Sequence, residues 1–324
     1  MTYNRPVWTV IVALGSLLSA GEEDAKPDKK AAPNPIRTIA DLPYAGTDNP
    51  RQQLDLYLSE KPASDKPLPV VVIIHGNFQN ADKKSGLGFA QAMVTGGKFA
   101  AVSIGYRLSD EAQWPAQIHD CKAAIRWVRG NAKKYNLDPE RIGVIGPSAG
   151  GHLAAVLGTS DKVPELEGTL GEYRDMSSRV ACVVDLFGPT NLLTLGVRHD
   201  RPNSPESKLL GGPIQEKKEL ARQASAITHV TADDPPFLLI HGTKDPNIPF
   251  VQSEMFVAAL KKVKVEAWLV PVEGGVHGNF RSPEVPQRFY VFFDKYLRDA
   301  DVKISTEPIV PGKDNNNKDN KPGG

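Results

Sequence analysis

One pentapeptide constrains this chain more than any other stretch. Gly146-Pro-Ser-Ala-Gly150, the pattern G-x-S-x-G, follows the short apolar run 142–145. A strand that turns at once into a helix leaves no room for side chains beside the turning residue, so glycines flank it. The turn pushes Ser148 outward and leaves the first backbone N–H groups of the helix free to bind an oxyanion. The pattern predicts a nucleophilic serine above a sheet edge, although a plain strand-to-helix turn can carry the same letters.

Apolar runs alternate with segments of helical period over residues 37–303. This alternation predicts βαβ units, with a mostly parallel central sheet flanked by helices on both faces. The run 53–58 alternates polar and apolar residues, as expected of an edge strand, whereas 68–74 is continuously apolar, as expected of a central parallel strand. Residues 187–235 interrupt the alternation, and we expect this insertion to form a small cap over a pocket.

The two ends of the chain differ from this unit in composition. Residues 1–20 contain Arg5, an apolar run and a small residue at its end. This pattern is typical of a secretory signal peptide, so we expect a secreted or periplasmic protein without a stable membrane anchor. Residues 21–36 and 304–324 are rich in polar residues and proline. We expect them to be a disordered linker and a disordered tail around a catalytic domain at 37–303.

Charge and motifs exclude several classes of partner. The 324 residues carry a formal net charge of +1, which gives no electrostatic argument for nucleic acid or an anionic membrane. No H-E-x-x-H, phosphate-binding loop or dinucleotide fingerprint is present, so we expect neither metal nor organic cofactor. Cys121 and Cys182 have apolar neighbours, which favours free buried thiols over a disulfide. The sequence leaves the oligomeric state open.

A serine nucleophile requires a base, a group that orients the base, and donors for the oxyanion. His75 and His241 each follow an apolar strand and precede a glycine, where an imidazole is usually a backbone-bonded structural group. His277 lies in the glycine-rich loop 273–280, after the last apolar run, and we predict that it is the base. His152 faces either the substrate or the protein interior, and we favour packing.

Asp245 is the predicted acid. It follows the apolar run 237–240 directly, and one helix and one strand separate it from His277, so both side chains can reach the same sheet edge. The chain order Ser148, Asp245, His277 is nucleophile, acid, base, which is one known order of such triads. Glu273 is the rival acid because it lies close to His277 in sequence.

Together these motifs resemble the α/β-hydrolase superfamily, in the esterase and lipase branch that includes hormone-sensitive-lipase-like enzymes and bacterial feruloyl and acetylxylan (BD-FAE-like) esterases. The resemblance covers about residues 45–300. The matching residues are His75-Gly76, Tyr106-Arg107-Leu108, Trp114-Pro115, Asp120, Ala123-Ala124, the stretch 146–152, Pro235-Pro236, His241-Gly242 and His277-Gly278. It implies the α/β-hydrolase fold and a serine carboxylic ester hydrolase that forms an acyl-enzyme, acting on small acyl esters such as acetyl or feruloyl groups on carbohydrate.

One turn departs from the family pattern. The family usually has His-Gly-Gly-Gly-Trp after the third strand, and this chain has His-Gly-Asn-Phe-Gln at 75–79. Asn tolerates positive φ, so we expect the N–H groups of Asn77 and Ala149, with Gly76 as a third candidate, to hold the oxyanion. Phe78 and Gln79 are expected to reshape the acyl pocket, and Phe187 is a further candidate for substrate binding.

Two other functions stay open. A peptidase of the prolyl-oligopeptidase type shares this catalytic domain, but such proteins usually carry a long β-propeller, for which there is no room before residue 37. A homologue that has lost catalysis is the other alternative, and the altered turn at 77–79 gives it some weight.

Overall fold

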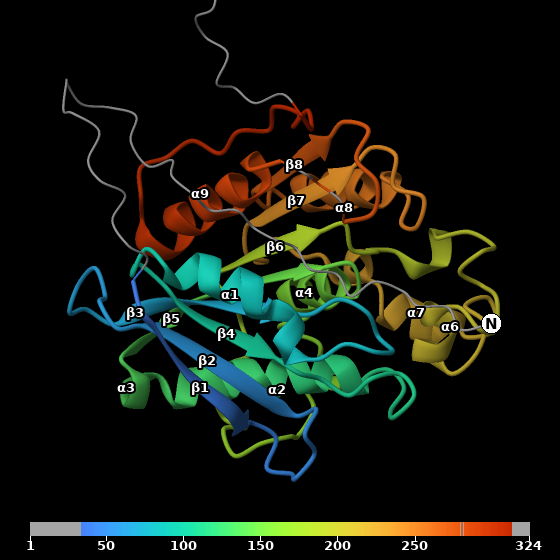
Figure 1. Ribbon diagram of the computed structural model, residues 1–324. Helices are drawn as coiled ribbons and strands as arrows, with labels where there is room; N and C mark the ends of the chain where they lie inside the picture. Colours follow the sequence, from blue (N-terminus) through green and yellow to red (C-terminus); the bar gives the residue numbers. More distant parts are fainter. Residues whose placement is uncertain (1–33, 279, 281, 313–324) are drawn as a thin grey trace, which may run out of the picture.

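The computed structural model describes residues 34–278, 280 and 282–312, so the expected signal peptide and most of the expected linker lie outside the described residues. Eight strands form one sheet in the order β1-β2-β4-β3-β5-β6-β7-β8 (Figure 1). The strands are β1 (Ile36–Pro43), β2 (Gln53–Ser59), β3 (Leu68–Ile74), β4 (Ala100–Ile104), β5 (Leu137–Pro147), β6 (Cys182–Leu186), β7 (Phe237–Gly242) and β8 (Ala267–Val272). Among the described strands, β2 pairs antiparallel with β1 and β4, and the remaining pairs are parallel.

Helices cover both faces of the sheet. They are α1 (Leu87–Val94), α2 (Ala116–Gly130), α3 (Ala132–Tyr135), α4 (Ala149–Thr159), α5 (Pro164–Glu167), α6 (Pro205–Leu210), α7 (Lys218–Gln223), α8 (Val251–Lys262) and α9 (Glu284–Arg298), with 3-10 turns η1 (Lys83–Gly86), η2 (Leu192–Thr194) and η3 (Ala226–His229). Helices α1 and α9 bury side chains in one apolar cluster, and α2, α4 and α8 bury theirs in a second cluster (Figure 1). This is the predicted α/β-hydrolase architecture. Within the described ranges, no helix is long and apolar enough to cross a membrane.

The continuously apolar strand behaves as its sequence predicts. Every residue of β3 is buried, because alternate side chains enter the two clusters on opposite faces of the sheet. Cys121 belongs to one cluster and Cys182 to the other, and both are free buried thiols. The predicted free cysteines are therefore confirmed, and the sheet between the clusters excludes the alternative disulfide.

The edge of the sheet differs from the sequence expectation. We expected 53–58 to be an edge strand, but β2 lies between β1 and β4. The edge strand on this side of the sheet is β1, whose residues are exposed or half-buried throughout. Its sequence, Ile-Arg-Thr-Ile-Ala-Asp-Leu-Pro, contains few apolar residues in a row because an edge strand covers little of the core. The residues before β1 have the composition of a linker, so the sequence gives no signal for where this strand begins.

The expected tail is wrong for its first residues. Ile304 is buried, and Ile309 is 0% exposed and pairs in parallel with Val272 of β8. The backbone N–H of Glu273 donates to the Ile309 carbonyl at 2.8 Å, and the Ile309 N–H donates to the Pro271 carbonyl at 2.8 Å. Two isoleucines separated by four polar or proline residues give no periodic apolar run, which is why composition assigned them to a tail.

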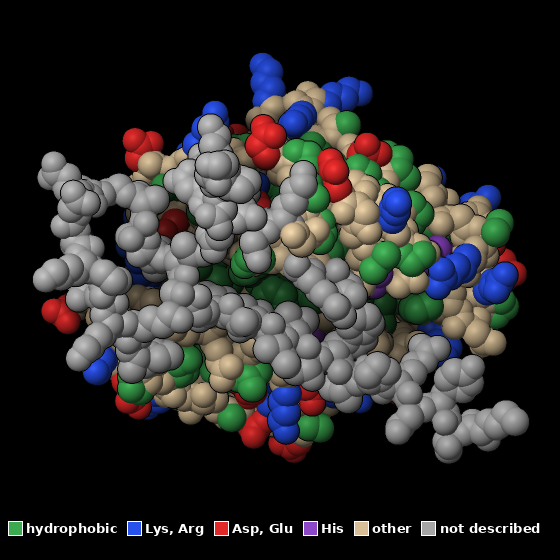
Figure 2. Space-filling model, turned by 45° about the horizontal axis from the view of Figure 1, so that its top comes forward, with side chains coloured by type: hydrophobic (Ala, Val, Ile, Leu, Met, Phe, Trp, Pro, Cys, Tyr) green, Lys and Arg blue, Asp and Glu red, His purple; other side chains and the backbone are tan. Residues whose placement is uncertain are grey.

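Charge is spread over the surface. On the face shown in Figure 2, described Lys and Arg side chains alternate with Asp and Glu side chains and with hydrophobic ones. The formal net charge of +1 agrees with this mixture. The described part of this face therefore offers no single-sign region that would attract a polyanion.

We predict that Ile309→Ala lowers the free energy of unfolding by about 2–5 kcal/mol, because it removes a fully buried side chain from the outer edge of β8. Urea unfolding measures the change. Thr306→Ala, at an exposed position in the same segment, is the control and should stay within about 0.5 kcal/mol of wild type. Equal stability of both variants would contradict the packing of this segment.

Candidate active site

Ser148 joins β5 to α4 in a strained conformation, with φ 54° and ψ −118°. The two glycines of the pattern make this possible. A β-carbon on Gly146 would lie 2.3 Å from the carbonyl carbon of Gly150, and one on Gly150 would lie 2.1 Å from the carbonyl oxygen of Ile74. The backbones of β3, β5 and α4 thus meet without space for a side chain, as the sequence pattern predicts.

The structure brings Ser148, Asp245 and His277 together. They follow β5, β7 and β8 respectively, at the carboxyl ends of three parallel strands. Nε2 of His277 lies 2.9 Å from Oγ of Ser148, and Nδ1 of His277 lies 2.7 Å from Oδ2 of Asp245. Glu273, the rival acid, is exposed, and Asp245 holds the position beside Nδ1.

Hydrogen-bond donors surround the Asp245 carboxyl group. Its Oδ1 accepts from the N–H groups of Asn247 at 2.8 Å and Ile248 at 3.0 Å. Burial alone would raise the pKa of Asp245, but the hydrogen bonds from His241, His277 and the backbone outweigh burial and hold that pKa well below its usual range. Asp245 is therefore ionised at neutral pH. An ionised carboxylate fixes the Nδ1–H tautomer of His277 and leaves Nε2 free to accept a proton.

His75 and His152 are structural, as predicted. Nδ1 of His75 donates to the Gly76 carbonyl at 2.9 Å, and the ring stacks on Tyr106 with centroids 4.1 Å apart. Nε2 of His152 donates to the Ala224 carbonyl at 2.6 Å. Burial lowers the pKa of each ring to about 4, so both are neutral and packed.

His241 has a role that the sequence did not reveal. Its Nδ1 lies 2.8 Å from Oγ of Ser253, and its Nε2 lies 3.0 Å from the Ile248 carbonyl and 3.3 Å from Oδ2 of Asp245. The buried ring thus adds a second imidazole contact to the acid. Its position four residues before Asp245 is the only sequence signal for this contact, and strand-end histidines are common in purely structural roles.

The turn after β3 packs closely against the serine turn. A β-carbon on Gly76 would lie 2.9 Å from the Pro147 carbonyl oxygen. Asn77 adopts the expected positive φ, 68°, and its Oδ1 accepts from the N–H of Gln79 at 2.9 Å. Ala149 is the first residue of α4, so its N–H has no partner within the helix. The two backbone segments thus face each other across the serine turn.

Two of the three candidate substrate-binding residues are aromatic and largely buried. Phe78 packs edge-on against His152 with centroids 5.6 Å apart, so its ring faces the core. Phe187, at φ 49°, packs against His277 in a T-shaped arrangement with ring centroids 4.8 Å apart. Gln79 is half-buried beside the turn. The Phe187 ring therefore packs beside the His277 imidazole, whereas the Phe78 ring packs against His152 in the core.

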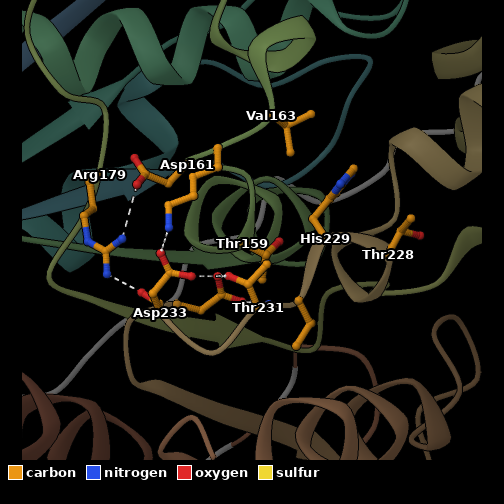
Figure 3. A pocket seen from close by; sticks show the side chains of 11 residues that line it. Thr159, Asp161, Val163, Arg179, Thr228, His229, Thr231 and Asp233 are labelled. Atoms are coloured by element: carbon orange, nitrogen blue, oxygen red, sulfur yellow. Dashed lines mark hydrogen bonds and ion pairs between the residues drawn. The ribbon is translucent and has the colours of Figure 1, made fainter. Parts of the chain in front are cut away.

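A separate cavity lies at the other end of α4. It has a volume of about 240 Å³ and is lined by Thr159, Asp161–Val163, Arg179, Thr228–Thr231, Asp233 and Asp234 (Figure 3). None of the predicted site residues lines it. Its charged groups are paired with each other: Arg179 lies 3.2 Å from Asp161, and Lys162 binds Asp233. We therefore place the candidate site at the serine turn.

A family model described as BD-FAE matches residues 54–260. The chain belongs to the BD-FAE family. Its similarity extends to Esterase LipC of Mycobacterium tuberculosis, which is 32% identical over 241 residues, 71% of this chain and 58% of LipC. Esterase LipQ of the same organism is 32% identical over 236 residues, 71% of this chain and 55% of LipQ. The chain thus spans less than two thirds of the length of these curated relatives.

Solved structures agree with the BD-FAE assignment. A truncated carbohydrate esterase from gut microbiota superposes with a TM-score of 0.75 at 33% identity, covering 81% of this chain and 96% of that one. A bifunctional GH43-CE protein of Bacteroides eggerthii gives a TM-score of 0.74 at 35% identity, covering 80% of this chain and 35% of that one. The fold and the family inferred from the sequence motifs are confirmed.

We predict that Gly150→Ala destabilises the protein by about 1–3 kcal/mol or more and removes ester hydrolysis, because the new methyl group would collide with backbone carbonyls. Thermal unfolding and activity measure the two effects. Gly212→Ala is the matched control, since its β-carbon would meet only the flexible end of Lys217, at 3.0 Å. A Gly150→Ala variant as stable and active as Gly212→Ala would refute the tight serine turn.

Proposed function

We propose that this BD-FAE family member is a serine carboxylic ester hydrolase that acts through an acyl-enzyme intermediate. One observation carries the proposal: the Ser148 hydroxyl, the His277 imidazole and the Asp245 carboxylate form a continuous hydrogen-bonded chain at the carboxyl edge of the sheet. The two relatives matched over 241 and 236 residues are both named esterases, and this supports the choice of esters over other acyl substrates.

The geometry suits nucleophilic catalysis. Oγ of Ser148 attacks the ester carbonyl carbon while Nε2 of His277 takes the hydroxyl proton. Asp245 stabilises the imidazolium that forms, and His277 then gives the proton to the leaving alcohol. Water then attacks the acyl-enzyme as His277 takes its proton, and His277 returns that proton to Oγ of Ser148 as the bond to the acyl group breaks and the acid leaves. The first proton transfer follows the 2.9 Å contact from Oγ of Ser148 to Nε2 of His277, and the 2.7 Å contact from Nδ1 to Asp245 holds the imidazole in place without passing a proton.

Backbone N–H groups of Ala149 and Asn77, with Gly76 as the third candidate, hold the oxyanion in this proposal. The helix N-terminus at Ala149 and the positive φ of Asn77 support it, because the first N–H groups of a helix have no acceptor within the helix and a left-handed residue can turn its N–H toward a neighbouring turn. Such donors gain strength as negative charge develops on the substrate oxygen. They therefore act on the rate of the chemical step more than on binding.

The proposed substrates are small acyl esters, such as acetyl or feruloyl groups on carbohydrate. The carbohydrate-esterase relatives, at 33% and 35% identity, support this choice. The Phe187 ring beside His277 supplies an apolar neighbour for a small acyl group in this proposal. Phe78 and Gln79, where the family usually has Gly and Trp, are expected to change the acyl preference rather than the chemistry.

A panel of acetyl, feruloyl and long-chain esters tests the function. We predict hydrolysis of the short and feruloyl esters, and a fall of about 10⁴-fold or more for Ser148→Ala. The control Ser85→Ala changes an exposed serine and should retain full activity. Cleavage of a proline-containing peptide without ester hydrolysis would favour the peptidase alternative. Inactivity on every substrate would favour a non-catalytic homologue.

The oxyanion role of the β3 turn predicts a kinetic split. Asn77→Val places a β-branched residue at positive φ and should redirect the local N–H, lowering kcat by about 100-fold (about 3 kcal/mol) with little change in KM. Asn77→Gly keeps the backbone conformation and should stay within a few-fold of wild type. Steady-state kinetics on one ester distinguishes the two. If the valine variant keeps the wild-type kcat, this turn supplies no donor.

A further inference from the structure

A buried charged pair lies in the insertion between β6 and β7, outside the triad. His199 is 8% exposed, and Glu206, in α6, is 5% exposed. Nδ1 of His199 lies 3.0 Å from Oε2 of Glu206, and Nε2 lies 2.9 Å from the backbone carbonyl oxygen of Asn247. The Asn247 carbonyl accepts from Nε2, and the Glu206 carboxyl group beside Nδ1 is an ion-pair partner only for a protonated ring. The contacts therefore favour an imidazolium at His199.

The partner of this imidazolium is the turn that carries the acid. The carbonyl of Asn247 binds His199, and the N–H of the same residue donates to Oδ1 of Asp245 at 2.8 Å. Arg198 binds the turn as well, with Nη1 2.8 Å from the Pro246 carbonyl and Nη2 3.1 Å from Oδ1 of Asn247. The turn is thus held by the insertion on one side and by the Asp245 carboxylate on the other.

The loop that presents His199 is itself fixed. The His199 carbonyl accepts from Oγ of Ser204 at 2.5 Å and from Oγ of Ser207 at 3.3 Å. Ser204 also caps α6, since its Oγ accepts from the N–H of Ser207 at 3.1 Å. The loop and the first turn of α6 therefore hold His199 and Glu206 as one unit. A rigid unit of this kind transmits its position to the residues it binds.

We propose that His199 and Glu206 form a positioning pair that fixes the acid turn 245–248, so that the insertion sets how well Asp245 orients His277. Among the described residues, the pair makes no hydrogen bond or ion pair with Ser148 or His277, so it acts through the backbone of Asn247. This inference rests on the proposed esterase function. It adds two residues of the insertion to the machinery that determines the rate.

The charge state of the pair gives it a pH signature. The Glu206 carboxylate raises the pKa of His199, while burial and Arg198 work in the opposite direction. The Asp245 carboxylate binds His277 and the N–H groups of its own turn, and Oδ1 of Asp200 accepts from the N–H of Gln215. A raised pKa means that the pair is complete below the ordinary histidine pKa of about 6.5 and is lost as the pH rises through the folded-state value. The effect of the pair on kcat therefore fades on the alkaline side.

Three variants separate the hydrogen bond from the charge. His199→Ala removes both and should lower kcat by roughly 10- to 100-fold, with KM changed only a few-fold, because the acid is displaced while the binding surface remains. His199→Gln keeps a donor for the Asn247 carbonyl and should restore most of kcat, with a flatter alkaline limb. Glu206→Gln keeps the shape but removes the charge, and should move the alkaline limb to lower pH.

His119→Ala is the matched control, since Nε2 of His119 makes a 2.9 Å contact with the Glu165 carbonyl and has no contact with the acid turn. Complete labelling with a fluorophosphonate counts the folded sites in each sample, so that kcat is expressed per active site. His119→Ala should keep the wild-type kcat and pH profile. If His199→Ala does not fold, the pH profiles of His199→Gln and Glu206→Gln decide the question.

The inference is overturned if His199→Ala, per labelled site, matches His119→Ala in kcat and pH profile. It is also overturned if Glu206→Gln leaves the alkaline limb unmoved. A wild-type protein that hydrolyses no ester would instead remove the proposed function, and the two failures are distinguishable because the first requires an active wild type. Loss of stability without loss of kcat per labelled site would make the pair structural only.

Discussion

The close contact of three backbone segments at the serine turn is the constraint on which the site depends. Gly150 lies against the carbonyls of Ile74 and His75, and Gly76 lies against Pro147. The register of β3 beside β5 fixes these contacts, because both strands are central, and β3 and the segment 142–146 of β5 are fully buried. Such a frame can hold Ser148 at a positive φ that a flexible loop would relax. The strain at the nucleophile thus follows from the packing of the sheet.

The acid side of the site has a different origin, which is electrostatic. Burying a carboxylate costs free energy unless hydrogen bonds replace its water shell. Asp245 has such replacements from two backbone N–H groups and two imidazoles. His241 in turn contacts Ser253 at the start of α8. The carboxylate therefore stays ionised because several elements donate to it. A substitution in any of these elements is expected to alter how Asp245 orients His277.

Most of the sheet and the grouping of the three triad candidates could be predicted from the sequence, because the signal for each strand end is local. An apolar run followed by a turn identifies a strand end, and parallel strands place their carboxyl ends at one edge. Features that depend on distant pairing were not predictable in this way. Strand β1 shows no alternation, Ile309 joins β8 across a long chain separation, and His199 meets Asn247 from an aperiodic insertion.

The insertion also contacts the nucleophile side, so it joins both halves of the site. His152, one turn into α4, binds the Ala224 carbonyl, and the N–H of Trp114 donates to the Leu209 carbonyl at 2.8 Å. On the acid side, Oε1 of Gln252 accepts from the N–H groups at the start of the insertion. Because the insertion is bound on the nucleophile side and on the acid side, it cannot change shape for a new substrate without displacing the acid turn or α4. In this fold, substrate preference and catalytic rate are therefore coupled through the insertion, and changes in one are expected to alter the other.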